Sequence, residues 1–269
     1  MTIPQLHFYN MAADIVAFST TRQVGFSTGH YAAFNINRYC GDSEEHVAMN
    51  RRALCQQLAI SDELLVMPHQ THETNVLRID QTFFDMTAAE RQVALEGIDA
   101  LTTDCRGVCI GVSTADCIPV LLYDSEHHAV SAIHAGWRGT VQRIVMKAVE
   151  TMTAHYGTRP ERLLAQIGPG ISMQSFEVGD EVYETFRNAG FDMLPISRRY
   201  PVANSTQTEK WHIDLPGCNR LQLLEAGVSP AAVSVTPICT FMNPDTFFSA
   251  RRLGIQSGRI FTAIMLRLS

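Results

Sequence analysis

The chain has 269 residues, 46% of them hydrophobic and 18% charged, so it is long enough to bury a sizeable core. Its formal net charge of −6 disfavours a broad nucleic-acid-binding surface, because phosphate backbones attract basic faces. The N-terminal residues show no signal-peptide pattern, and no apolar run approaches the ~20 residues that span a bilayer. We therefore expect a cytoplasmic protein with no nucleic-acid or membrane partner.

Short apolar runs predict strands in the first half of the chain, separated by turn-forming residues. These runs are Asp14–Thr20, Leu64–Met67, Asn75–Ile79, Val108–Ser113, Val120–Tyr123 and Ala129–Ile133. Between the first two, Ser43–Ala59 shows the apolar spacing of a helix, which Asp42 or Ser43 would cap. Glu44 and Glu45 fall in its first turn, where the helix dipole favours acids.

Helices and strands continue to alternate in the second half. Apolar residues from Val141 to Met152 repeat with helical period, and Gly157 would end that helix. The remaining predicted elements are strands at Leu163–Ile167, 211–215, Ala232–Thr236 and around Phe247–Ala250, and helices at Asp180–Ala189 and Asn219–Ala226. The fold class is therefore α+β or mixed α/β, with mixed sheets packed by helices. No linker divides the chain, so we expect one domain over residues 1–269.

The cysteines predict reduced thiols rather than disulfides. There are seven, an odd number scattered over a long chain: Cys40, Cys55, Cys105, Cys109, Cys117, Cys218 and Cys239. Cys105 and Cys109 are four residues apart, but no second pair follows, so a zinc knuckle has little support there.

Several metal-ligand side chains fall beside predicted turns. His69 and His72 lie in PHQTHE between two strands, Cys117 lies in TADCIP, and His134 ends a strand before a glycine-rich turn. Two histidines and one cysteine match a catalytic zinc site, which keeps a fourth position open. The three positions are far apart in the sequence, so each residue also has an ordinary structural interpretation. Cys117 could be a buried thiol, His134 could bond a backbone carbonyl, and His72 could be a surface turn residue.

The segment HAGWRGT (134–140) is a second candidate binding element. Gly136 and Gly139 allow a sharp turn just before a helix, whose N-terminus would attract anions. Arg138 would add a bidentate donor, although on composition alone a solvated arginine at a helix start is the more common case.

Longer motifs carry more information than these spacings. They run in one order along nearly the whole chain and include HQTHETNV (69–76), STADCIPVLLYD (113–124), AIHAGWRGT (132–140), IGPGISMQSFEVGDEV (167–182) and FFSARR (247–252). The chain resembles the YfiH/DUF152 family, also called laccase-domain or polyphenol-oxidase-like. The resemblance implies a CNF1/YfiH-like fold. It also implies two activities, that of a purine nucleoside phosphorylase and that of an adenosine deaminase.

In that family the metal ligands are the His of Q-x-H, the Cys of ADC and the His of HAGWRG. The resemblance thus implies that His72, Cys117 and His134 bind zinc and form the catalytic centre, and it selects His72 over His69. Two positions depart from the family pattern: Glu73 replaces the glycine of QVHG, and Val24 replaces a glycine near Arg22.

The leading hypothesis is zinc-dependent cleavage of adenosine, inosine or methylthioadenosine by phosphate, which gives free base and ribose 1-phosphate. Resemblance and charge suggest Arg51, Arg138 and Arg251 for phosphate binding. For deamination, zinc would activate water toward the purine carbon that bears the amine. We expect purine nucleosides and phosphate as the partners of a monomer.

Three other hypotheses stay open at this stage. A metal-free hydrolase would use Cys117 as nucleophile and His134 or His72 as its base. A copper polyphenol oxidase would need many imidazoles, and this chain has ten histidines but no His-x-His pair. A non-enzymatic module would hold a structural zinc with a fourth ligand from Cys105, Cys109 or His69.

Overall fold

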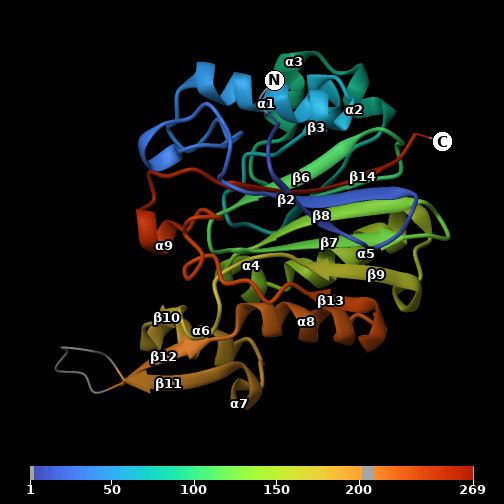
Figure 1. Ribbon diagram of the computed structural model, residues 1–269. Coiled ribbons are helices and arrows are strands. Elements are labelled where there is room, and N and C mark those ends of the chain that lie inside the picture. The colour runs from blue at the N-terminus through green and yellow to red at the C-terminus, as the bar shows by residue number, and fades with distance from the viewer. Residues whose placement is uncertain (1–2, 202–208, 269) are drawn as a thin grey trace.

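The computed structural model describes residues 3–201 and 209–268, and their strands form three sheets (Figure 1). The five-stranded sheet has the order β1 (Leu6–Tyr9), β2 (Ile15–Thr20), β14 (Ile260–Leu266), β6 (Cys109–Thr114) and β3 (Leu65–Val66). The six-stranded sheet has the order β13 (Val233–Val235), β9 (Leu163–Ile167), β7 (Ile118–Asp124), β8 (Ala129–Ala135), β5 (Ile98–Thr103) and β4 (Asn75–Arg78). The smallest has the order β10 (Glu177–Val178), β12 (Glu209–Ile213) and β11 (Ser197–Pro201).

Helices cover the outer faces of the two larger sheets. The α-helices are α1 (Glu44–Leu58), α2 (Gln81–Asp85), α3 (Ala88–Ala94), α4 (Trp137–Val141), α5 (Ile144–Tyr156), α6 (Asp180–Asn188), α7 (Met193–Ile196), α8 (Leu215–Glu225) and α9 (Ala250–Leu253). Helix α5 packs on β8 and β5, and α8 packs on α5. In Figure 1, α1 to α3 lie on the side of the molecule opposite to α5 and α8, and α6 and α7 lie beside the smallest sheet.

The two larger sheets pack face to face. Ile110 and Ile264 of one sheet meet Leu121 and Val130 of the other in a shared apolar cluster. Because β7 and β8 are covered on both faces, every one of their residues is buried, which explains their continuous apolar sequences.

Strand register brings chemically active residues to one edge of the six-stranded sheet. Pro119 of β7 pairs with His134 of β8, and Ala100 of β5 pairs with Ile133 of β8. The start of β7, the end of β8 and the start of β5 therefore meet. Cys117, His134 and Asp99 occupy these positions.

Most predicted elements are confirmed. Ser43 caps α1 by accepting the N–H of His46, and Gly157 ends α5 in the left-handed conformation. All seven cysteines are free thiols. In the described ranges, no helix combines the length and apolar character that crossing a membrane requires.

Two predictions about the C-terminal part are wrong. Phe247 to Ala250 form no strand, because Phe247 and Phe248 pack on Ile260 in a small separate cluster and Ser249 caps α9. Helix α8 begins at Leu215, four residues before the predicted start, because Asp214 caps it and Pro216 fits its first turn. Strand β14, central in the five-stranded sheet, was not predicted.

Candidate metal centre

His72, Cys117 and His134 converge although they are far apart in the sequence. Their ligand atoms, the two imidazole nitrogens and the cysteine sulfur, all lie within 4.8 Å of one another. Cys117 Sγ lies 4.0 Å from His72 Nε2, and the two imidazole centroids are 4.9 Å apart. His134 is buried and His72 is exposed, so the cluster lies at the surface end of a buried strand.

The loop that carries His72 is fixed to the five-stranded sheet by Gln70. The Gln70 side chain donates to the carbonyl of Ser113 at 2.8 Å and accepts from the Ser113 N–H at 2.7 Å. Ser113 belongs to β6, the strand that precedes the Cys117 turn. One amide thus connects two of the three ligand-bearing segments.

Asp99 connects the strand that carries His134 with the loop that carries His72. Its buried carboxylate accepts from His134 Nδ1 at 2.7 Å and from the backbone N–H groups of Thr71, His72 and Glu73 at 3.3, 3.1 and 2.8 Å. A carboxylate accepts only, so His134 carries a proton on Nδ1, and in the neutral ring the Nε2 lone pair faces the cluster. The three N–H bonds hold His72 at φ +67°, in the left-handed region.

The metal-free cluster is strongly polarised. Burial alone would raise the pKa of Cys117, but the neighbouring His134 and His72 lower it to about 6. Burial would lower the pKa of His134, but Cys117 and Asp99 raise it to about 9. Burial would also raise the pKa of Asp99, but its bonds to His134 and the backbone lower it. At neutral pH the thiolate that metals require is therefore already formed.

The donor set fits a tetrahedral zinc ion with one open position. Bonds of about 2.0–2.3 Å require ligand atoms about 3.3–3.8 Å apart, close to the cysteine–histidine separation of 4.0 Å. Gly136 leaves the necessary room, because a Cβ there would lie 3.1 Å from both Cys117 Sγ and His72 Cδ2. The carboxylate behind His134 is the partner that metal-bound histidines usually have.

The three ligand side chains open into a small cleft. Its volume is about 160 Å³, and its lining includes Tyr39, His69, Gln70 and Arg259 besides the ligands. The guanidinium of Arg259 donates to the carbonyls of Ile255 and Gly258 at 2.8 and 3.1 Å. Sequence reasoning did not find Tyr39 or Arg259, because neither lies in a recognisable ligand motif.

None of the three arginines suggested for phosphate lines this cleft. Arg51 is buried, and its guanidinium bonds Asp62 at 2.8 Å and the carbonyl of Leu65 at 3.1 Å, which is a structural role. Arg138 is exposed, with its guanidinium 4.5 Å from the centre of a Trp137 ring. Arg251 lines a different, larger cavity.

The alternative fourth ligands lie outside the cluster. Cys109 is fully buried in the apolar cluster that α1 covers. The Cys105 thiol points to the carbonyl of Ile79 at 3.9 Å. His69 reaches the cleft but bonds Glu96 through Nδ1.

Val24, which stands where the family pattern near Arg22 has a glycine, keeps a backbone conformation typical of glycine. Val24 has φ +58°, a conformation that β-branched residues seldom adopt. Arg22 nevertheless holds the segment in place, because its guanidinium bonds the carbonyls of Ala32 and Pro244, each at 2.8 Å. The segment therefore keeps its place against the C-terminal loop despite the substitution.

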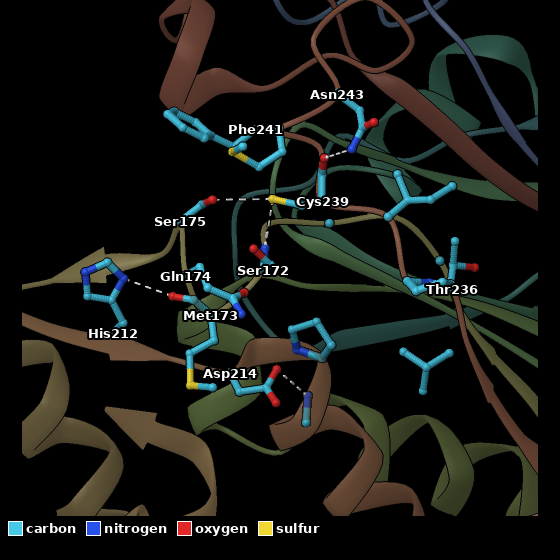
Figure 2. Close-up of a pocket in the computed structure, with 18 of the residues that line it drawn as sticks. Ser172, Met173, Gln174, Ser175, His212, Asp214, Thr236, Cys239, Phe241 and Asn243 are labelled. Atoms are coloured by element: carbon cyan, nitrogen blue, oxygen red, sulfur yellow. Dashed lines mark hydrogen bonds between the residues drawn. The ribbon is translucent and has the colours of Figure 1, made fainter. Parts of the chain in front are cut away.

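A second cavity of about 1100 Å³ lies beside the Asp116–Cys117 turn. Gly170 and Arg251 line it, and both contact Asp116. Figure 2 shows Cys239 between Ser172 and Ser175 on its wall. The N–H of Ser172 lies 3.3 Å from the Cys239 sulfur, and the thiol lies 3.5 Å from the Ser175 hydroxyl. Burial would raise the pKa of Cys239, but these neighbours lower it.

Known proteins resemble this chain over almost its full length. A family model described as multi-copper polyphenol oxidoreductase laccase matches residues 16–267. The purine nucleoside phosphorylase of Bacteroides thetaiotaomicron is 49% identical over 254 residues, 94% of this chain and 92% of that protein. Adenosine deaminase RL5, from an unknown prokaryotic organism, is 43% identical over 262 residues, 97% of this chain and 98% of that protein.

Solved structures show the same fold. YlmD from Geobacillus stearothermophilus matches with a TM-score of 0.87 and 30% identity, over 100% of both chains. YfiH from Bacillus licheniformis matches with a TM-score of 0.85 and 27% identity, over 94% of this chain and 93% of that one. These matches confirm the mixed α/β fold class and the resemblance to YfiH.

Proposed function

We propose a function for this chain on the basis that it belongs to the family described as multi-copper polyphenol oxidoreductase laccase, the YfiH/DUF152 family. It is an enzyme of this family. Its function, in our proposal, is zinc-dependent phosphorolysis of purine nucleosides, with adenosine deamination as a second activity. The observation that carries the proposal is the convergence of His72, Cys117 and His134 behind one organising carboxylate, Asp99.

Zinc is the metal that this donor set fits best. Bound there, it would supply a Lewis acid and lower the pKa of water. In the described part of the chain, this cluster is the only group of three or more His, Cys, Asp or Glu side chains placed to share an ion. A multi-copper centre would need several such groups. The ligand set therefore supports one ion rather than the several that the family description names.

The protein's own contribution is orientation. Asp99 fixes which nitrogen of His134 faces the ion, and Gln70 fixes the loop of His72. At about 160 Å³ the cleft is smaller than the 300–1,000 Å³ typical of ligand pockets, so it would hold the reacting atoms rather than a whole nucleoside. Arg259 is the cation on its wall, and we place phosphate beside it.

The test combines activity with metal content. Zinc-loaded protein given inosine and phosphate should release free base and ribose 1-phosphate, and adenosine alone should yield inosine. Alanine variants of His72, Cys117 and His134 should lose both activities, whereas His155→Ala, an exposed histidine on α5, should keep them. No product above the level of the cluster variants would overturn the proposal.

The metal-free hydrolase is the second candidate, because the polarised Cys117–His134 pair also suits a cysteine nucleophile. Zinc measured on the native protein separates the two functions. About one zinc per chain, lost in Cys117→Ala, supports the metal enzyme. A native protein without metal that is inactivated by one alkylation at Cys117 supports the hydrolase.

We further propose that residues 1–269 act as one domain on small molecules. The cleft draws lining residues from Asn37 to Arg259, so nearly the whole chain is needed to complete it.

A further inference from the structure

A second histidine–carboxylate pair lies at the cleft of the metal ligands. His69 Nδ1 lies 2.8 Å from both carboxylate oxygens of Glu96. The backbone fixes the pair as well, because the His69 N–H donates to the carbonyl of Leu95 and the Gly97 N–H donates to that of His69, each at 3.0 Å. His69 lines the cleft but is not part of the metal cluster.

Tyr39 fixes the plane of the His69 ring. The two rings stack with centroids 4.2 Å apart and planes inclined by 21°. Tyr39 is itself positioned by Asn37, whose side-chain oxygen accepts the Tyr39 N–H at 2.6 Å. Glu96 occupies Nδ1 and Tyr39 occupies one ring face, so Nε2 is the nitrogen left for a ligand in the cleft.

The two histidine–carboxylate pairs differ in access to water. The His134 side chain is 3% exposed and its Asp99 partner 0%, which suits a fixed ligand. The His69 side chain is 35% exposed and its Glu96 partner 57%, which suits a group that exchanges protons with solvent.

We propose that His69 donates the proton that the departing purine needs during phosphorolysis, with Glu96 and Tyr39 as its positioning residues. This inference rests on the proposed function. A phosphate oxygen forms a bond to the anomeric carbon of the ribose while the bond from that carbon to N9 breaks. The electron pair of the broken bond passes to the purine ring, and N7 takes the proton from His69 Nε2. Neutral His69 keeps its Nδ1–H bond to Glu96 and regains a proton from solvent.

The experiment compares two nucleosides that differ in their need for this proton. The base of inosine leaves as an anion unless it is protonated, whereas 7-methylinosine already carries the positive charge at its imidazole ring. In zinc-loaded His69→Asn, kcat for inosine should fall about 100-fold or more, because general acid catalysis contributes about 10²–10⁴-fold. For 7-methylinosine kcat should fall less than about threefold, and KM for both should change little.

His127→Asn is the matched control. His127 Nδ1 bonds Asp124 at 2.9 Å and its side chain is 34% exposed, close to the values for His69, but it lies at the opposite end of β7 from the cleft. It should keep wild-type activity with both nucleosides. Glu96→Gln should show the same selective loss as His69→Asn, but smaller.

The outcomes separate this inference from the proposed function. Selective loss with inosine supports His69 as the proton donor. Equal loss with both nucleosides, or no loss with either, would overturn that role while leaving phosphorolysis intact. If the wild-type protein cleaves neither nucleoside, the proposed function fails and the inference fails with it.

Discussion

The small cleft and the large cavity on either side of the Asp116–Cys117 turn are organised in opposite ways. In the cleft of about 160 Å³, the Asp99 carboxylate accepts four hydrogen bonds and orients ligands from two separate segments. In the cavity of about 1100 Å³, the corresponding carboxylate, Asp214, caps helix α8 through the N–H of Gly217. The carboxylate of the larger cavity therefore orients no cluster of reactive side chains. A carboxylate that orients such a cluster indicates the reactive region better than volume does.

Among the substitutions that test this contrast, Asp99→Asn should cause the largest loss of zinc affinity. The amide cannot accept from His134 and from three backbone N–H groups in the way the carboxylate does, so both the ring and the loop of His72 lose orientation. Removing such a partner typically costs about 10–100-fold in metal affinity. Competition for zinc with a chelator of known affinity measures the change.

Asp124→Asn provides the control for a buried carboxylate. Asp124 is 0% exposed like Asp99, and it accepts from the N–H groups of Glu126 and His127 at the far end of β7. This variant should lose stability but keep the native zinc affinity. If both variants lost affinity equally, general destabilisation rather than ligand orientation would explain the Asp99 result.

Thiol reactivity should next distinguish the large cavity from the apolar core under α1. At pH 7 iodoacetamide should modify Cys239 about tenfold faster than the buried Cys55, because the pKa of Cys239 is lowered while burial raises that of Cys55 to about 11. The Cys239 rate should also level off at a lower pH than that of an ordinary thiol, since its thiolate forms earlier.

Bound zinc should protect Cys117 in the same experiment, and chelation should expose it to alkylation. Peptide mass spectrometry identifies the modified residue, and Cys239→Ser shows which signal belongs to the large cavity. Modification of Cys117 at equal rates with and without zinc would contradict its role as a ligand.

The sequence predicted the strands that carry Cys117 and His134, because their signals are local, but it did not predict β5, which carries Asp99. Continuous apolar runs marked β7 and β8, whose burial on both faces requires such residues. Family motifs, not spacing, selected His72 over His69. Asp99 could not be singled out, because its role depends on three-dimensional pairing of β5 with β8.

Two other expectations depend on tertiary contacts that the sequence does not reveal. Arg51 looked available for phosphate, but α1 places its guanidinium beside Asp62, which lies eleven positions further along the chain. The strand predicted around Phe247–Ala250 is wrong because this segment pairs with no sheet, and its two aromatic side chains pack from a loop against Ile260 at the start of β14. Aromatic content alone does not distinguish a strand from a buried loop.

Gly136→Ala should show how closely the cleft is fitted around its ion. The backbone of Gly136 has φ −67°, which alanine adopts freely, so the fold should tolerate the change. The new methyl would lie 3.1 Å from Cys117 Sγ and from His72 Cδ2, closer than ordinary contact. We expect zinc affinity to fall several-fold with thermal stability unchanged. Unaltered affinity would mean that the ligands can move aside without cost.

Asp214→Ala, a substitution in the large cavity, should have the smallest effect: a modest loss of stability with zinc affinity unchanged. Loss of this cap leaves the N–H of Gly217 without its side-chain acceptor, which typically costs about 1 kcal/mol. Urea unfolding of the zinc-loaded protein measures that loss, and chelator competition should give the wild-type zinc affinity. A drop in zinc affinity would instead show that the cavity and the cleft are coupled across the Asp116–Cys117 turn, and that the two regions work as one site.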